Sequence, residues 1–93
     1  LRMGADGIAI SPDGKLLYYC PLAGRRLYAV SIDALVDPGK SDLDVGKTVQ
    51  DLGERTIASD GLESDAAGNL YLTDYEHNAI RRRAPDGSYT VVT

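Results

Sequence analysis

The chain has 93 residues and a mass of 10.0 kDa, which is enough for one small domain. Its 43% hydrophobic and 26% charged residues argue against a disordered chain, which has too little apolar surface to offset its entropy. A net charge of −4 argues against nucleic acid or an anionic membrane as the main partner, and the single cysteine, Cys20, excludes an internal disulfide framework.

Eight short strands are predicted along the chain. In chain order these are Gly7–Ser11, Lys15–Cys20, Arg25–Ile32, Thr48–Leu52, Gly61–Ser64, Leu70–Asp74, Ala79–Arg83 and Ser88–Val92. Tight turns separate them, as in Pro12-Asp13-Gly14, where Pro presets φ and Gly supplies a positive φ. Between the third and fourth strands, residues 33–47 are expected to form an insertion, with a helical turn at Ser31–Val36 and a surface excursion at Pro38–Val45.

Two parts of the sequence repeat one another. Residues 6–19 align without a gap on residues 60–73, an offset of 54, so that Leu16 matches Leu70. Four antiparallel strands that recur at roughly this period are typical of the blades of a β-propeller. We therefore predict an all-β protein with about two four-stranded antiparallel blades, at residues 5–53 and 59–93, within one domain fragment of residues 1–93.

Each blade of a propeller is a sheet whose two faces pack on neighbouring blades. Two blades leave two faces uncovered, and we expect the apolar side chains of Leu16, Tyr18, Leu70 and Leu72 to lie there. The chain is thus expected to be about one third of a closed ring, completed by further blades or by self-association, and to associate or aggregate when isolated. The alternative is a self-contained β-sandwich of the same eight strands.

The segment Gly7–Val30, GIAISPDGKLLYYCPLAGRRLYAV, resembles the Yellow/major royal jelly protein family. That family has a similar strand–turn–strand with a Tyr-Tyr-x-Pro-Leu element, which is residues 18–22 here, and its Asn-Ala-Ile is similar to residues 78–80. The likeness is nearest to bacterial members and covers roughly Gly4–Ser88. It implies small-molecule binding in the central channel of a propeller, and it favours a secreted or periplasmic protein.

A broader likeness links the chain to the regucalcin–gluconolactonase superfamily, so the resemblance implies a partial six-bladed β-propeller. Those enzymes begin one inner strand with Asn-Gly and the next with Asp-Gly, and this Asn and this Asp bind a divalent metal. Asp6 and Asp60 stand at the matching positions, with Asp6 in place of the Asn. The resemblance therefore implies a divalent metal, calcium first, bound by Asp6 and Asp60, with a further Glu ligand from another blade. The alternative is that both carboxylates make Asx hydrogen bonds into the following turn.

Three functions are compatible with these features. The first is small-molecule binding in the channel, because several Yellow-like proteins resemble carriers of small aromatic amines. The second is a metal-dependent lactone or ester hydrolase, in which the metal polarises a carbonyl and orients water, and Asp60 is the candidate catalytic residue. The third is a propeller scaffold with no small-molecule site.

Further candidate channel residues lie on or after the inner strand of the second repeat. Glu63 replaces the small Ala9 of the first repeat, which indicates either a channel-lining acid that partners Asp60 or a buried carboxylate paired with an arginine. The polar residues at the end of the next strand and in its loop are expected at the same mouth: Asp74, Tyr75, His77 and Asn78.

Three other features have structural interpretations. His77 is either a base or ligand, or an exposed loop histidine without a role. Cys20 is expected to be a packed small hydrophobe rather than a nucleophile. Arg81, Arg82 and Arg83 alternate between the two faces of a strand, so they do not form one basic patch.

Overall fold

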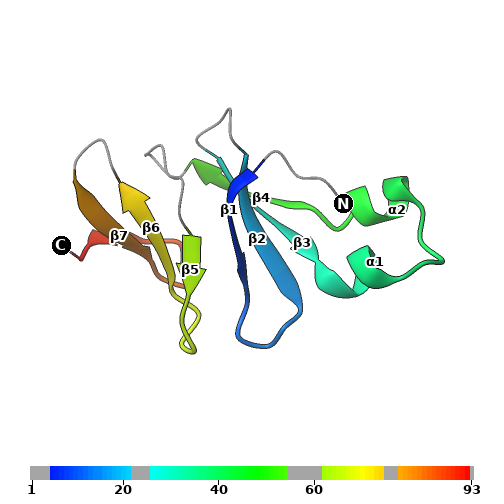
Figure 1. Cartoon of the computed structure of the whole chain (residues 1–93), viewed down its shortest axis with the longest axis horizontal. Coiled ribbons are helices and arrows are strands. Elements are labelled where there is room, and N and C mark those ends of the chain that lie inside the picture. Colours follow the sequence, from blue (N-terminus) through cyan, green and yellow to red (C-terminus); the bar gives the residue numbers. More distant parts are fainter. Residues whose placement is uncertain (1–4, 22–25, 55–61, 75–77, 93) are drawn as a thin grey trace.

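Two four-stranded antiparallel sheets lie side by side in the computed structural model (Figure 1). The structure describes residues 5–21, 26–54, 62–74 and 78–92, with the side chains of residues 5, 6, 21 and 74 outside the description. The first sheet is built in chain order from β1 (Ala5–Ile10), β2 (Leu16–Pro21), β3 (Arg26–Ser31) and β4 (Gln50–Glu54). The second is built from β5 (Leu62–Ser64), β6 (Leu70–Asp74), β7 (Ala79–Arg83) and β8 (Tyr89–Val91). The predicted pair of four-stranded sheets is confirmed.

The connection between β3 and β4 contains two short helices, α1 (Ile32–Val36) and α2 (Asp42–Gly46). The hydroxyl of Ser31 caps α1 by accepting a hydrogen bond from the Ala34 amide at 3.2 Å, as the predicted helical turn requires. The surface excursion expected at Pro38–Val45 is confirmed, since residues 38–44 are exposed. Part of it forms α2, with Ser41 as its cap. No helix in the described part of the chain is long and apolar enough to cross a membrane.

The fourth strand begins two residues later than predicted. Thr48 lies in the turn that follows α2, where its hydroxyl donates to the Val45 carbonyl at 2.8 Å. The same hydroxyl oxygen accepts from the Ser31 amide at 3.2 Å, which ties the helical connection to the end of β3. The strand then runs from Gln50 to Glu54.

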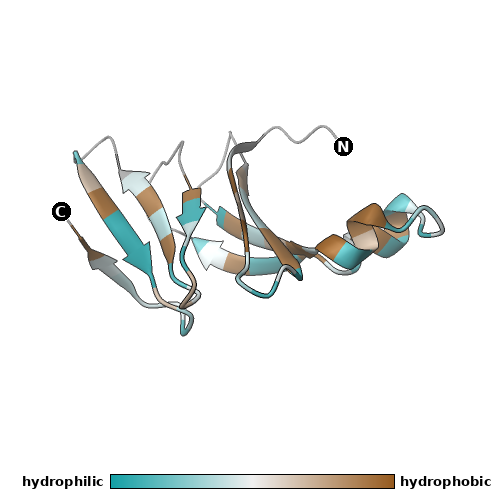
Figure 2. Cartoon of the chain, turned by 60° about the horizontal axis from the view of Figure 1, so that its bottom comes forward, coloured by the Kyte–Doolittle hydropathy of each residue, from teal (hydrophilic) through white to brown (hydrophobic). Residues whose placement is uncertain are grey.

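The hydrophobic core lies between the two sheets. Bands of apolar residues cross the strands of both sheets in Figure 2. The buried members are Ala9, Cys20 and Leu27 from the first sheet, and Leu62, Leu70 and Leu72 from the second. Leu70 and Leu72 are 1% and 0% exposed, so their expected position on an uncovered outer face is wrong. They fill the contact between the sheets instead.

Strand register explains this difference. Ile10 pairs with Leu17 in the first sheet, whereas the equivalent Ser64 pairs with Leu70 in the second. Leu70 is therefore equivalent to Leu17, and the gapless match to Leu16 is wrong by one residue. A shift of one residue moves a side chain to the opposite face of a sheet.

The extra residue lies in the first hairpin turn. The Ser11 amide donates to the carbonyl of Leu16, five residues on, whereas the Asp65 amide donates to the carbonyl of Asn69, four residues on. The Ser11 hydroxyl accepts from the Leu16 amide at 3.0 Å, so the longer turn keeps its backbone groups paired. The positive φ predicted for Gly14 is confirmed at 73°.

Candidate functional site

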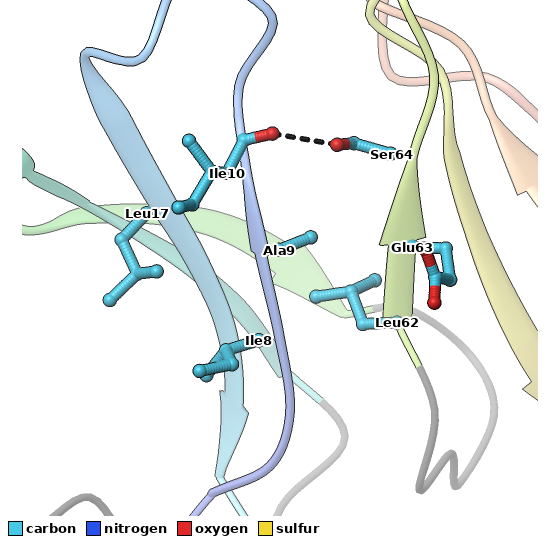
Figure 3. A pocket seen from close by; sticks show the side chains of 7 residues that line it. All are labelled: Ile8, Ala9, Ile10, Leu17, Leu62, Glu63 and Ser64. Atoms are coloured by element: carbon cyan, nitrogen blue, oxygen red, sulfur yellow. Dashed lines mark hydrogen bonds between the residues drawn. The ribbon is translucent and has the colours of Figure 1, made fainter.

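The two innermost strands, β1 and β5, run in the same direction and lie next to each other (Figures 1 and 3). Figure 3 shows Ala9 and Leu62 between these strands, with Ile10 and Ser64 at their far ends. The Ser64 hydroxyl donates a hydrogen bond of 2.6 Å to the Ile10 carbonyl and so joins the two sheets. Parallel inner strands place their own first residues, Ala5 and Leu62, at one end of the molecule.

A cavity of about 510 Å³ opens beside the beginnings of these strands. Its size is within the usual range of small-ligand sites. A second cavity, of about 380 Å³, lies along β1 and β5 and is shown in Figure 3. The larger one is lined by Gly7, Ile8, Leu62, Glu63, Tyr71, Leu72, Thr73 and Ile80. Among these residues Glu63 alone carries a charge, so one carboxylate faces a mainly apolar and aromatic wall.

Tyr71 in this wall is held in place by Asp65. Its hydroxyl donates to the Asp65 carboxylate at 2.8 Å. The side-chain amide of Asn69 donates to the same carboxylate at 3.0 Å, and the backbone amides of Ala67 and Asn69 donate at 3.0 Å. These donors, the Asn69 amide first and Tyr71 next, lower the pKa of Asp65 to about 2. The sequence analysis did not predict the contact between Tyr71 and Asp65. The signal available for it was an Asp in the turn, six residues before a Tyr.

Asp6 occupies an irregular position in β1. Ala5 pairs with Pro21 and Gly7 pairs with Cys20, so Asp6 is the extra residue of a β-bulge. Bulges re-aim side chains and are common beside functional sites. Its predicted partner Asp60 lies outside the described residues. The metal-ligand role predicted for both carboxylates stays a prediction.

Glu63 has an exposed side chain, so the alternative of a buried carboxylate paired with an arginine is wrong. Glu63 lies on β5 and lines the cavity, and its role as a channel-lining acid stays a prediction. Asn78 is exposed and has a left-handed backbone with φ of 52°, which turns the chain into β7. The side chain of Asp74, and the whole of Tyr75 and His77, lie outside the described residues.

The structural interpretations of Cys20 and of the three arginines are confirmed. Cys20 is 1% exposed and belongs to the core. On β7, Arg82 is exposed like Ile80, whereas Arg81 and Arg83 are half-buried on the opposite face. Within the described residues, no group of three His, Cys, Asp or Glu side chains is placed to hold a metal ion.

Residues 1–92 match the major royal jelly protein family. The chain belongs to this family. An uncharacterized protein of Sulfolobus acidocaldarius is 30% identical over 78 residues, which are 84% of this chain and 27% of that protein. This major royal jelly protein family member thus spans little more than a quarter of the length of that relative.

A solved structure has the same arrangement of strands. Regucalcin from Agrobacterium tumefaciens, a calcium-binding protein, matches this family member with a TM-score of 0.69 and 25% identity. The match covers 90% of this chain and 28% of the regucalcin chain. The two sheets therefore correspond to part of the six-bladed regucalcin propeller, and the predicted family and fold are confirmed. Calcium binding is a property of that neighbour.

Proposed function

We propose that this chain forms part of a small-molecule-binding channel in a Yellow-like propeller. The observation that carries the proposal is the cavity beside the inner strands, where the Glu63 carboxylate lies among Ile8, Tyr71 and Ile80. Small-ligand sites typically combine apolar walls with a few placed polar groups. The family resemblance likewise implies small-molecule binding in the central channel of the propeller.

The chemistry of the wall favours a small aromatic amine as ligand. A protonated amine is attracted by the exposed carboxylate of Glu63, while Tyr71 offers an aromatic face to a ring. The hydrogen bond from Tyr71 to Asp65 orients that face before any ligand arrives. A preorganised wall reduces the ordering cost of binding.

A nuclear magnetic resonance titration of the 93-residue chain tests this proposal. The probes are tyramine and tyrosol, which share a phenol ring but differ in the amine. We expect Glu63→Gln to weaken tyramine binding about fivefold, because a charge pair in a water-exposed setting contributes roughly 1 kcal/mol at 4 Å. Tyrosol binding should not change.

Glu54→Gln is the matched control, because Glu54 is also an exposed strand carboxylate but lies on the edge strand β4. It should leave both probes unaffected. If tyramine and tyrosol bind equally well to the unmodified chain, the proposed recognition of the amine is refuted. If neither probe binds, the proposed small-molecule site is refuted.

A metal-dependent lactone hydrolase is the second candidate function. Two observations favour it, namely the bulge at Asp6 and the likeness to a calcium-binding propeller. Carboxylate oxygens suit Ca²⁺. The family resemblance implies that Asp6 and Asp60 are the residues of this chain that would hold the ion. When bound, a divalent ion supplies Lewis acidity toward a carbonyl oxygen.

Calorimetric titration with CaCl₂ tests the metal part. Asp60→Ala should weaken Ca²⁺ binding at least tenfold, which is about 1.4 kcal/mol, since it removes an anionic ligand. Asp13→Ala is the control. Asp13 accepts from the Ser11 hydroxyl at 2.6 Å and the Lys15 amide at 3.0 Å, in the turn at the far end of β1. That variant should lower the melting temperature without changing Ca²⁺ affinity, and the same behaviour in Asp60→Ala would refute the metal site.

A further inference from the structure

The Asp65 carboxylate divides its hydrogen bonds between its two oxygens. Oδ1 accepts from the backbone amides of Ala67 and Asn69, both at 3.0 Å, and so closes the turn between β5 and β6. Oδ2 accepts from the side-chain amide of Asn69 at 3.0 Å and from the Tyr71 hydroxyl at 2.8 Å. The backbone of the turn therefore depends on one oxygen, and the tyrosine depends on the other.

The first sheet shows what this turn position needs for its own structure. Ser11 is equivalent to Asp65, because the amide of each donates across the turn to the carbonyl at which the chain enters the next strand. The Ser11 hydroxyl accepts from the Leu16 amide at 3.0 Å, as Oδ1 of Asp65 accepts from the Asn69 amide. One hydroxyl oxygen is thus enough to pair this backbone amide. The second oxygen of Asp65 is additional, and it holds side chains.

The two sheets also hold their equivalent tyrosines differently. Tyr18 is equivalent to Tyr71, since each pairs with the penultimate residue of its inner strand. Tyr18 faces the second sheet and packs against the core between the sheets. Tyr71 points to the face of β6 opposite to the core leucines, where it lines the cavity with Glu63. The contact between the two sheets does not fix Tyr71, whereas the hydrogen bond to Asp65 does.

The group that holds Tyr71 is itself fixed in place and in charge. Gly68 has a φ of 89°, and a Cβ atom there would lie 3.3 Å from Cγ of Pro85, in the turn between β7 and β8. The lack of a side chain at Gly68 lets the two turns touch, so the second turn supports the first. The hydrogen bonds from Asn69 and then Tyr71 lower the pKa of Asp65 to about 2, so the carboxylate is charged at neutral pH.

We propose that Asp65 is a positioning residue for the channel site, and that its Oδ2 atom sets the orientation of the Tyr71 ring in the cavity wall. This role rests on the proposed function, and Asp65 itself does not line the cavity. The Tyr71 side chain is fixed at both ends, by the backbone of β6 and by its hydroxyl. A ligand ring therefore meets an aromatic face that is already in place, and binding does not have to immobilise it. The gain applies to any aromatic ligand, whatever its charge.

Asp65→Ser tests this role, because serine is the residue that the first sheet has at this position. The variant keeps an oxygen for the turn amide and removes the oxygen that holds Tyr71. In the nuclear magnetic resonance titration, tyramine and tyrosol should both bind about fivefold more weakly, since each must now immobilise the ring. Glu63→Gln has a different expected pattern, because it should weaken tyramine binding alone.

A double-mutant cycle with Tyr71→Phe separates this role from a general effect on the turn. Tyr71→Phe keeps the ring and removes the hydroxyl, so it should weaken both probes by the same factor as Asp65→Ser. The double variant should bind no more weakly than either single variant, because both changes delete one contact. Asp13→Ser is the matched control, in the first-sheet turn where the carboxylate accepts from Ser11 and Lys15, and it should leave both affinities unchanged.

Two results would overturn the role of Asp65 and leave the proposed site intact. Asp65→Ser could bind both probes as tightly as the unmodified protein does. The losses of Asp65→Ser and Tyr71→Phe could instead multiply in the double variant, which would show that Asp65 does not act through Tyr71. If neither probe binds to the unmodified protein, the proposed site is refuted, and the positioning role with it. If circular dichroism shows that Asp65→Ser is unfolded, Tyr71→Phe decides alone, and unchanged affinities in that variant overturn the role.

Discussion

Replacing Leu70 by alanine removes three carbon atoms from the contact between the two sheets. Leu70 is 1% exposed and belongs to the cluster that joins Leu27 and Leu72. The loss of transfer free energy is about 2.4 kcal/mol, at roughly 0.8 kcal/mol for each buried carbon. The cavity left between two four-stranded sheets adds to this, so we expect a total loss of about 3–4 kcal/mol in the free energy of unfolding.

Leu17→Ala is the matched comparison, because Leu17 has the same residue type and the equivalent strand position. Its side chain faces away from the second sheet and is half-buried, so we expect a loss of less than about 1 kcal/mol.

Urea unfolding followed by circular dichroism measures the difference. Trimethylamine N-oxide keeps the weaker variant folded in the starting buffer, since this osmolyte strengthens effective burial. The midpoint should fall much further for Leu70→Ala than for Leu17→Ala, with the same slope for both. Equal losses would refute the assignment of Leu70 to the interface and of Leu17 to the outer face. A larger loss for Leu17 would show that the sheets pack through their other faces.

Two further predictions concern the polar contacts around the inner strands. Ser64→Ala should lower the free energy of unfolding by about 1 kcal/mol, since it deletes the 2.6 Å hydrogen bond to the Ile10 carbonyl, and an unchanged urea midpoint would contradict this. The Asp65 carboxyl has a folded pKa of about 2, below its ordinary 3.8, so its contribution to stability is present above pH 4 and is lost as pH falls toward 2. The melting temperature of the unmodified chain should therefore drop more steeply between pH 4 and pH 2 than that of Asp65→Asn, and parallel curves would refute the lowered pKa of Asp65.

The order of strands and turns followed from the sequence alone, because these features are local. Alternating apolar residues and the Pro-Asp-Gly turn indicate a hairpin wherever they occur, and Gly14 has the predicted positive φ. The repeat and the family resemblance also needed only residue types and spacing. The second helix was missed although Ser41 and Asp44 form a capping pattern, because a five-residue helix has almost no periodic signal.

The candidate site was predictable in part. The sequence placed Glu63 on an inner strand, and the structure has it there in the wall of a cavity. The sequence did not indicate that Glu63 would be exposed, because exposure depends on the face that the neighbouring sheet covers. Nor did it indicate the Tyr71–Asp65 contact or the bulge at Asp6, which arise from pairing between strands.

Burial in this protein was decided by tertiary structure, through a single residue in a turn. The turn after Ser11 is one residue longer than the turn after Asp65, so Leu70 is equivalent to Leu17 and not to Leu16. Side chains alternate between the two faces of a strand, so one extra residue reverses every assignment beyond it. Sequence patterns determine that one face of each strand is apolar. The hydrogen-bond register between strands, and the sheet that lies opposite, determine which leucines are buried.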